Sequence, residues 1–186
     1  DSRWDELPIE NRKSKIENPL VLDYLTQLRG HSLLFAEESS TSLRFGMLES
    51  LREFAAEHLN PQERKEIERC HAAYFHQWVM EKPTDGQGQT VRFMRFEEDL
   101  DNLRTVLAWS MLEGNEIEIG LMTAARLTAF WDLRGRISEG RRWFDSLLER
   151  AGEAQTVGLS RALFGAGVLA SLQGDFQAAL ARIERC

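Results

Sequence analysis

The residues of this sequence that could do chemistry by their type do not have the spacing that chemistry requires. The histidines include no pair three or four positions apart, the separation that places two metal ligands on one face of a helix. These histidines are His31, His58, His71 and His76. No serine or cysteine lies in a recognised nucleophile motif, although a dispersed triad leaves no mark in a sequence. We therefore expect no catalytic residue and no metal site in this chain.

The glycine-rich segments predict no cofactor site either. Gly165 and Gly167 echo the dinucleotide-binding fingerprint, which also needs a preceding strand and an acid about 20 residues further on. No strand is predicted before these glycines, and residues 160–172 predict one helix whose small side chains allow close packing. Gly86 and Gly88 lack the lysine of a phosphate loop and predict a turn. We expect no cofactor to bind here.

A cluster of acidic residues lies near the predicted start of a helix. Its members are Glu97, Glu98, Asp99 and Asp101. Negative charge at this place is favoured by the helix dipole. A solvated helix face therefore explains the cluster better than a catalytic or metal-binding group of carboxylates.

Arginines beside tryptophan form the strongest candidate for function. Arginine and tryptophan carry much of the binding energy of many interfaces, because guanidinium groups pair with carboxylates and stack on rings. Tryptophans at repeat positions are, however, usually core residues. The candidate protein-interaction residues are Trp131, Arg134, Arg136 and Arg142, and the hypothesis is that the three arginines contact a partner or a nucleotide-binding module of the parent protein.

The composition narrows the class of protein. The 186 residues are 42% hydrophobic, which is enough for a real core in one or two domains, and the formal net charge is −7. That charge gives no basic surplus for nucleic-acid phosphates, so we expect the partner to be a protein and not nucleic acid. The two cysteines form no disulfide framework, and no apolar run reaches the roughly 18 residues of a membrane span. We expect a cytoplasmic location and no membrane insertion.

The first third of the chain predicts a small domain after a linker. Residues 1–19 show no sustained period and end in Asn-Pro, so they predict a linker or the end of a preceding domain. Residues 20–60 predict a short helix ended by Gly30, a β-hairpin over 33–47 and a second helix, which is the outline of a winged helix.

Residues 61–186 predict antiparallel helices of a tetratricopeptide-like type, so the fold class as a whole is mainly α. Asn60-Pro61 is a helix start signal, and one long amphipathic helix is predicted over 93–111. Gly135 and Gly174 each separate two helical patterns and lie 39 residues apart, which is longer than the ~34 residues of an ideal repeat. The last repeat stops before its second helix is complete, so we expect a domain truncated at its C-terminus.

Several spaced motifs carry a family resemblance. They are the run from Arg44 to Leu59 (RFGMLESLREFAAEHL), His71 to Phe75 (HAAYF), Asp101 to Arg104 (DNLR), Phe130 to Gly135 (FWDLRG) and Glu139 to Trp143 (EGRRW). Taken in this order, over about 20–186, the chain resembles bacterial STAND-type regulatory ATPases, including LuxR-type regulators. The resemblance implies a winged helix and the start of a tetratricopeptide-like sensor.

The resemblance also implies a function. In that family a nucleotide-binding module that holds ATP or ADP precedes these parts, but no phosphate-loop motif occurs in this chain. The chain is expected to be a non-catalytic regulatory and protein-interaction fragment, coupling effector or partner binding to that module. Its partner would be its own nucleotide-binding module, an effector protein or a second copy.

The alternative is a DNA-binding winged-helix fragment of a transcription factor. Its recognition helix would be 20–29, which offers Arg29 as its one cation, opposed by Asp23. Readout of bases and phosphates normally needs several donors. The sequence therefore favours regulation over DNA binding.

Overall fold

The computed structural model describes residues 19–38, 43–81 and 89–186. The chain separates into two compact units, Asp1–Asn60 and Pro61–Cys186. The linker predicted over 1–19 and the turn predicted at Gly86 and Gly88 lie outside the described residues, apart from Pro19 at the start of the first helix.

The first unit is a helix, a β-hairpin and a second helix. Its elements are α1 (Pro19–Gly30), β1 (Phe35–Glu38), β2 (Leu43–Gly46) and α2 (Glu49–Glu57). The strands are antiparallel, with Phe35 opposite Gly46, and the Phe35 ring lies over the space that a side chain at Gly46 would fill. The predicted order of elements is confirmed. None of the described residues of this unit is fully buried, so its apolar side chains form no closed core of their own.

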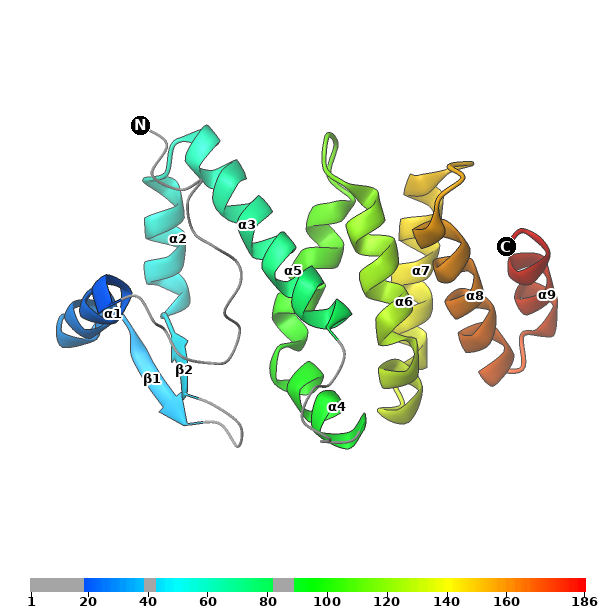
Figure 1. The fold of residues 1–186 in the computed structure, drawn as a ribbon, viewed down its shortest axis with the longest axis horizontal. Coiled ribbons are helices and arrows are strands. Elements are labelled where there is room, and N and C mark those ends of the chain that lie inside the picture. Colours follow the sequence, from blue (N-terminus) through cyan, green and yellow to red (C-terminus); the bar gives the residue numbers. More distant parts are fainter. Residues whose placement is uncertain (1–18, 39–42, 82–88) are drawn as a thin grey trace. The chain divides into compact units, whose positions relative to one another are not determined.

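The second unit is a series of antiparallel helices (Figure 1). They are α3 (Pro61–Met80), α4 (Gln89–Glu98), α5 (Leu100–Ser110), α6 (Ile117–Leu133), α7 (Ile137–Ala151), α8 (Val157–Leu172) and α9 (Phe176–Glu184). Together with the hairpin of the first unit, they confirm the predicted mainly helical fold with helical hairpins.

The single long helix predicted over 93–111 is wrong. The helix breaks at Asp99, whose backbone (φ −104°, ψ 14°) is not helical, and the side chain of Asn102 donates to Asp99 Oδ1 at 3.0 Å. The apolar stripe continues across the break, since Phe96, Leu100 and Leu103 are all buried in one cluster. Periodicity of apolar residues alone does not register a break that keeps the same face buried.

The turns within the last two hairpins are built alike. Gly135 (φ 67°) joins α6 to α7, and Gly174 (φ 78°) joins α8 to α9, in a left-handed conformation that favours glycine. The amide that follows each glycine donates back five residues, Arg136 N to Trp131 O at 2.7 Å and Asp175 N to Ala170 O at 3.0 Å. The 39-residue spacing seen in the sequence is therefore a repeat of structure as well.

Arginines close the C-terminal end of α3. Arg92 of α4 donates to the carbonyl of Val79, and Arg126 of α6 donates to the carbonyl of Met80 at 3.2 Å. The last carbonyls of a helix have no partner within the helix and carry partial negative charge. These two donors therefore fasten the end of α3 to α4 and α6.

The core of the second unit depends on close approach of helices at glycine. Trp131 of α6 and Phe144 of α7 are fully buried, with their rings edge to face and centroids 5.7 Å apart. A Cβ atom at Gly140 would lie 2.6 Å from both Trp131 Cε3 and Leu169 Cδ1. Only a residue without a side chain lets α7 approach α6 and α8 at this point.

We predict that Gly140→Ala destabilises the second unit by about 1–3 kcal/mol, the usual cost of overpacking a closed core. The indole of Trp131 is buried on all sides and cannot yield to the new methyl group. Urea denaturation followed by tryptophan fluorescence measures the change. Ser146→Ala, on an exposed position of the same helix, serves as the control and should change the free energy by less than about 0.5 kcal/mol. Equal stabilities of the two variants would contradict the packing argument.

Candidate interaction surface

A ladder of ion pairs joins the start of each second helix to the hairpin before it. Glu139 lies in the first turn of α7, and both of its carboxylate oxygens accept hydrogen bonds from Arg104 of α5. The donors are Nε, at 2.7 Å, and Nη2, at 3.0 Å. Arg141 of α7 donates to Asp175, which caps α9, at 2.6 Å. We call the set Glu97, Arg104, Arg134, Arg136, Glu139, Arg141 and Asp175 the hairpin-tip network, because its members lie at or near the turns that close the hairpins.

The network shifts the acidity of its carboxyl groups. Hydrogen bonds from Arg104 lower the pKa of Glu139 below its usual value of 4.5, and burial opposes this only in part. Hydrogen bonds from Arg141 and from the amide of Ala178 likewise lower the pKa of Asp175. Both carboxylates are therefore held in the charged form near neutral pH.

Two of the predicted interaction residues are paired inside the chain. Arg136 donates to Glu97 of α4, and Arg134 Nε lies 3.6 Å from the other oxygen of the same carboxylate. Glu97, a member of the acidic cluster, therefore pairs with two guanidinium groups, and its side chain remains 38% exposed. Arg142, one turn into α7, is exposed and forms no ion pair with any described residue.

Trp131 lies in the core. Its side chain is 1% exposed, and its indole Nε1 is buried without a hydrogen-bond partner among the described residues. Tryptophans at repeat positions are usually core residues, and Trp131 follows that pattern. Contact between Trp131 and a partner would require the hairpin to open. The hypothesis that Arg134, Arg136 and Arg142 contact a partner stays a prediction.

Sequence reasoning missed an exposed leucine at each hairpin tip. Leu133 ends α6 and Leu172 ends α8, and their side chains are 64% and 50% exposed. They lie 39 residues apart, two positions before Gly135 and Gly174. Aligning the sequence around Gly135 with that around Gly174 would have shown that a leucine recurs at the last helical position before each turn.

The other residues considered for chemistry have structural surroundings. His76 Nδ1 lies 3.0 Å from the hydroxyl of Thr123, which is fully buried, and His71 Nε2 lies 3.3 Å from Asn102 Oδ1. Burial lowers the pKa of His76. Among the described residues, no three His, Cys, Asp or Glu side chains are grouped so as to hold a metal ion. Within the same residues, no helix is long and apolar enough to span a membrane.

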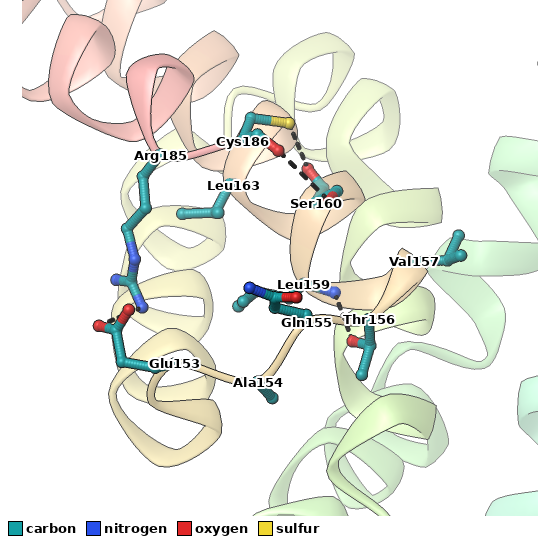
Figure 2. Close-up of a pocket in the computed structure, with 10 residues that line it drawn as sticks. All are labelled: Glu153, Ala154, Gln155, Thr156, Val157, Leu159, Ser160, Leu163, Arg185 and Cys186. Atoms are coloured by element: carbon teal, nitrogen blue, oxygen red, sulfur yellow. Dashed lines mark hydrogen bonds and ion pairs between the residues drawn. The ribbon is translucent and has the colours of Figure 1, made fainter.

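A pocket of about 530 Å³ lies beside the start of α8 (Figure 2). Glu153 and Arg185 line one side of it and form an ion pair at 3.3 Å, and Cys186 Sγ donates to the carbonyl of Ser160 at 3.1 Å. Leu159 and Leu163 form its apolar floor.

Comparisons with known proteins point to regulators of transcription. The chain is similar to "Putative HTH-type transcriptional regulator Rv0890c" of Mycobacterium tuberculosis and to "Putative HTH-type transcriptional regulator Mb0914c" of Mycobacterium bovis. Each is 34% identical over 131 residues, which are 69% of this chain and 15% of the relative. The chain thus spans less than a sixth of the length of these relatives. No family model and no solved structure matches it.

We predict that Glu139 contributes stability that depends on pH. Its pKa is lowered in the folded protein, so the contribution is present above about pH 4.5 and is lost as the pH falls through the lower folded value. Glu139→Gln should remove this part of the pH dependence, which is worth up to about 1 kcal/mol for a partly exposed pair. Urea denaturation between about pH 6 and pH 3 measures it. Glu149→Gln, exposed on the same helix, should keep the wild-type slope, and a Glu139→Gln protein with that slope would refute the assignment.

Proposed function

We propose that this chain is a non-catalytic, protein-binding part of an HTH-type transcriptional regulator, and that the hairpin tips of the second unit receive the partner. The class of protein rests on the two mycobacterial relatives. The role within it rests on one observation: exposed leucines recur at equivalent tips, Leu133 next to Arg134 and Leu172 next to Gln173, whose side chain accepts a hydrogen bond from Arg141 at 2.9 Å.

The tips have the chemistry of a recognition surface. Exposed leucine provides apolar area, and arginine provides donors in a fixed fork that suit carboxylates. The ion pairs of Arg104 with Glu139 and of Arg141 with Asp175 hold the turns in place before any partner arrives. A surface ordered in advance loses less conformational entropy on binding. The partner that fits is a protein segment with apolar side chains next to acidic ones.

A narrower form of the proposal comes from the resemblance to STAND-type ATPases. In that form the parent protein binds ATP or ADP in a separate module, and partner binding at the helical hairpins alters that module. The partner is then the nucleotide-binding module itself, an effector protein or a second copy. The names of the relatives support a regulator of transcription and mention neither a nucleotide nor an ATPase, so this form rests on the sequence motifs alone.

DNA binding by the first unit is the second candidate, and the names of the relatives favour it directly. A helix-turn-helix regulator contacts DNA through a basic recognition helix. The helix α1 offers one cation, Arg29, together with Asp23, and residues 19–60 contain three arginines against six acids. The charge therefore favours a regulator in which another part of the polypeptide contacts DNA.

We predict that Arg142→Glu, combined with Leu133→Ser, changes the response of the complete regulator at its promoter by about fivefold or more, because interface residues of this kind are worth about 1–2 kcal/mol. Neither residue is buried or ion-paired among the described residues, so the melting temperature should stay within about 2 °C of wild type. A reporter assay and a thermal melt measure the two effects. Leu112→Ser is the control, because Leu112 is 55% exposed in the loop between α5 and α6, at the other end of α6 from Leu133, and this variant should keep the wild-type response. An unchanged response of the double variant would remove the tips from partner binding.

We also predict that the chain does not retain duplex DNA. Gel shifts across a salt series should show no complex with a dissociation constant below about 10⁻⁶ M, the tighter end of non-specific binding. Tight binding lost in Arg29→Glu and kept in Arg161→Glu, a change on α8, would establish the second candidate instead.

A further inference from the structure

The hairpin that precedes α6 contains an added helix. Arg104 is the fifth residue of α5 and Arg141 is the fifth residue of α7, and each pairs with a carboxylate at the start of the second helix of the following hairpin. The helices α5 and α7 are therefore equivalent. The helices α7 and α9 follow turns of three residues, 134–136 and 173–175, whereas α5 follows residues 81–99, which include α4 (Figure 1). The helix α4 is thus an addition to the repeat.

The added helix places a carboxylate on two arginines of the next hairpin tip. Glu97, in the last turn of α4, accepts a hydrogen bond from Arg136, and its other carboxylate oxygen lies 3.6 Å from Arg134 Nε. That second distance is longer than a hydrogen bond, so Glu97 attracts Arg134 by charge without engaging its donors. The equivalents of Arg134 and Arg136 at the tip between α8 and α9 are Gln173 and Asp175. The two cations therefore occur at the tip that follows the added helix and not at the next one.

All three charged side chains lie at the surface. Arg134, Arg136 and Glu97 are 39%, 36% and 38% exposed. Ion pairs as exposed as these are weak, because water and other charged groups compete for both partners. A carboxylate from another molecule can therefore reach both guanidinium groups from solvent.

Release of the Glu97 side chain does not require α4 to unfold. The helix is anchored by Phe93 and Phe96, which are 7% and 1% exposed. The ring centroid of Phe96 lies 5.8 Å from that of Phe130 and 5.5 Å from that of Trp78. These contacts lie in the core, so α4 stays in place when the Glu97 carboxylate turns into solvent.

An apolar side chain adjoins the two arginines. Leu133, which directly precedes Arg134, is 64% exposed. Guanidinium groups bind carboxylates in a fixed geometry, and an exposed leucine adds apolar contact area. The ligand that fits the place of Glu97 is therefore a protein segment that carries carboxylates next to an apolar side chain.

We propose that Glu97 is an internal stand-in for a carboxylate of the partner, and that it occupies Arg134 and Arg136 until an acidic segment of a partner protein displaces it. The inference rests on the proposed function, in which the hairpin tips receive a protein, and it adds how this surface is regulated. The arginines are free only while the Glu97 side chain is turned away, so the apparent affinity for the partner is reduced by that fraction. Segments with several carboxylates then bind in preference to segments with one.

The test measures how the chain binds a fluorescein-labelled peptide, Glu-Glu-Leu-Glu-Glu-Leu, by fluorescence anisotropy at low ionic strength. Glu97→Gln should lower the dissociation constant by about threefold to tenfold, because it releases both arginines. Glu149→Gln is the control, since it removes the same charge from an exposed position on α7, and it should change the constant by less than about 1.5-fold. Binding of a peptide with glutamine in place of glutamate should not respond to Glu97→Gln.

A double-mutant cycle tests the pairing itself. Arg134→Gln should weaken binding of the acidic peptide more strongly in the Glu97→Gln protein than in the wild type, because Glu97 occupies this arginine in the wild type. Equal effects of Arg134→Gln in the two backgrounds would overturn the proposal. So would equal affinities of the Glu97→Gln and Glu149→Gln proteins for the acidic peptide.

A titration of the wild-type chain with the same peptide, followed by NMR, covers the case in which a variant fails to fold. The backbone amide signals of Leu133, Arg134, Arg136 and Glu97 should shift, and shifts confined to other residues would overturn the proposal. The inference and the proposed function can fail separately. An unchanged peptide affinity of Glu97→Gln, with an altered promoter response of the Leu133 and Arg142 variant, would remove the masking by Glu97 alone. The opposite pair of results would remove the proposed function alone.

Discussion

The second unit depends on the burial of one tryptophan between three helices. Trp131 is large and rigid, and it fits because α7 presents a glycine, Gly140, against its ring, while Gly165 of α8 leaves room for Phe144. A helix with side chains at those positions would stand further away and leave the ring partly in water. Burial of Trp131 together with the other residues of the core cluster removes apolar area from water, which stabilises the unit, and the glycines set how closely the helices approach. Glycine lowers the intrinsic stability of a helix, so close packing has to offset that cost at each such position.

The ion pairs have a different part. Most of their side chains remain more than a quarter exposed, and pairs of this kind contribute about 0–1 kcal/mol each. The ion pairs position the turns more than they stabilise the fold, because each pair links the start of one helix to the hairpin before it. Because Arg134 and Arg136 share Glu97, the cations at the first tip are already engaged, and Arg142 is left as the one exposed arginine of the predicted set without an ion pair among the described residues.

Local features of the sequence predicted most of the fold. Asn60-Pro61 marked the start of α3, and the glycines at 135 and 174 marked the turns, because a left-handed residue is demanded there whatever surrounds it. The break at Asp99 was not predictable, since the apolar face continues through it. The surroundings of the predicted interaction residues could not be predicted from the sequence. Glu97 and Arg136 form a pair across 39 residues of sequence, and the periodicity that placed Trp131 on a helix fits a core position as well as a surface position. The partner surface and the presence of nucleotide or DNA sites elsewhere in the polypeptide remain matters of proposal for the same reason.

The polar contacts between hairpins all join residues about one repeat apart in the sequence. Arg104 to Glu139, Arg141 to Asp175 and Arg182 to Asp145 span 35, 34 and 37 residues, about one repeat each. Nothing in this network ties one end of the array to the other, so the chain behaves as a row of links that fold by adding to a neighbour. Such a row folds quickly for its size, because no contact waits for a long loop to close. It also loosens in steps of about one hairpin, because each hairpin is held mainly by its neighbours.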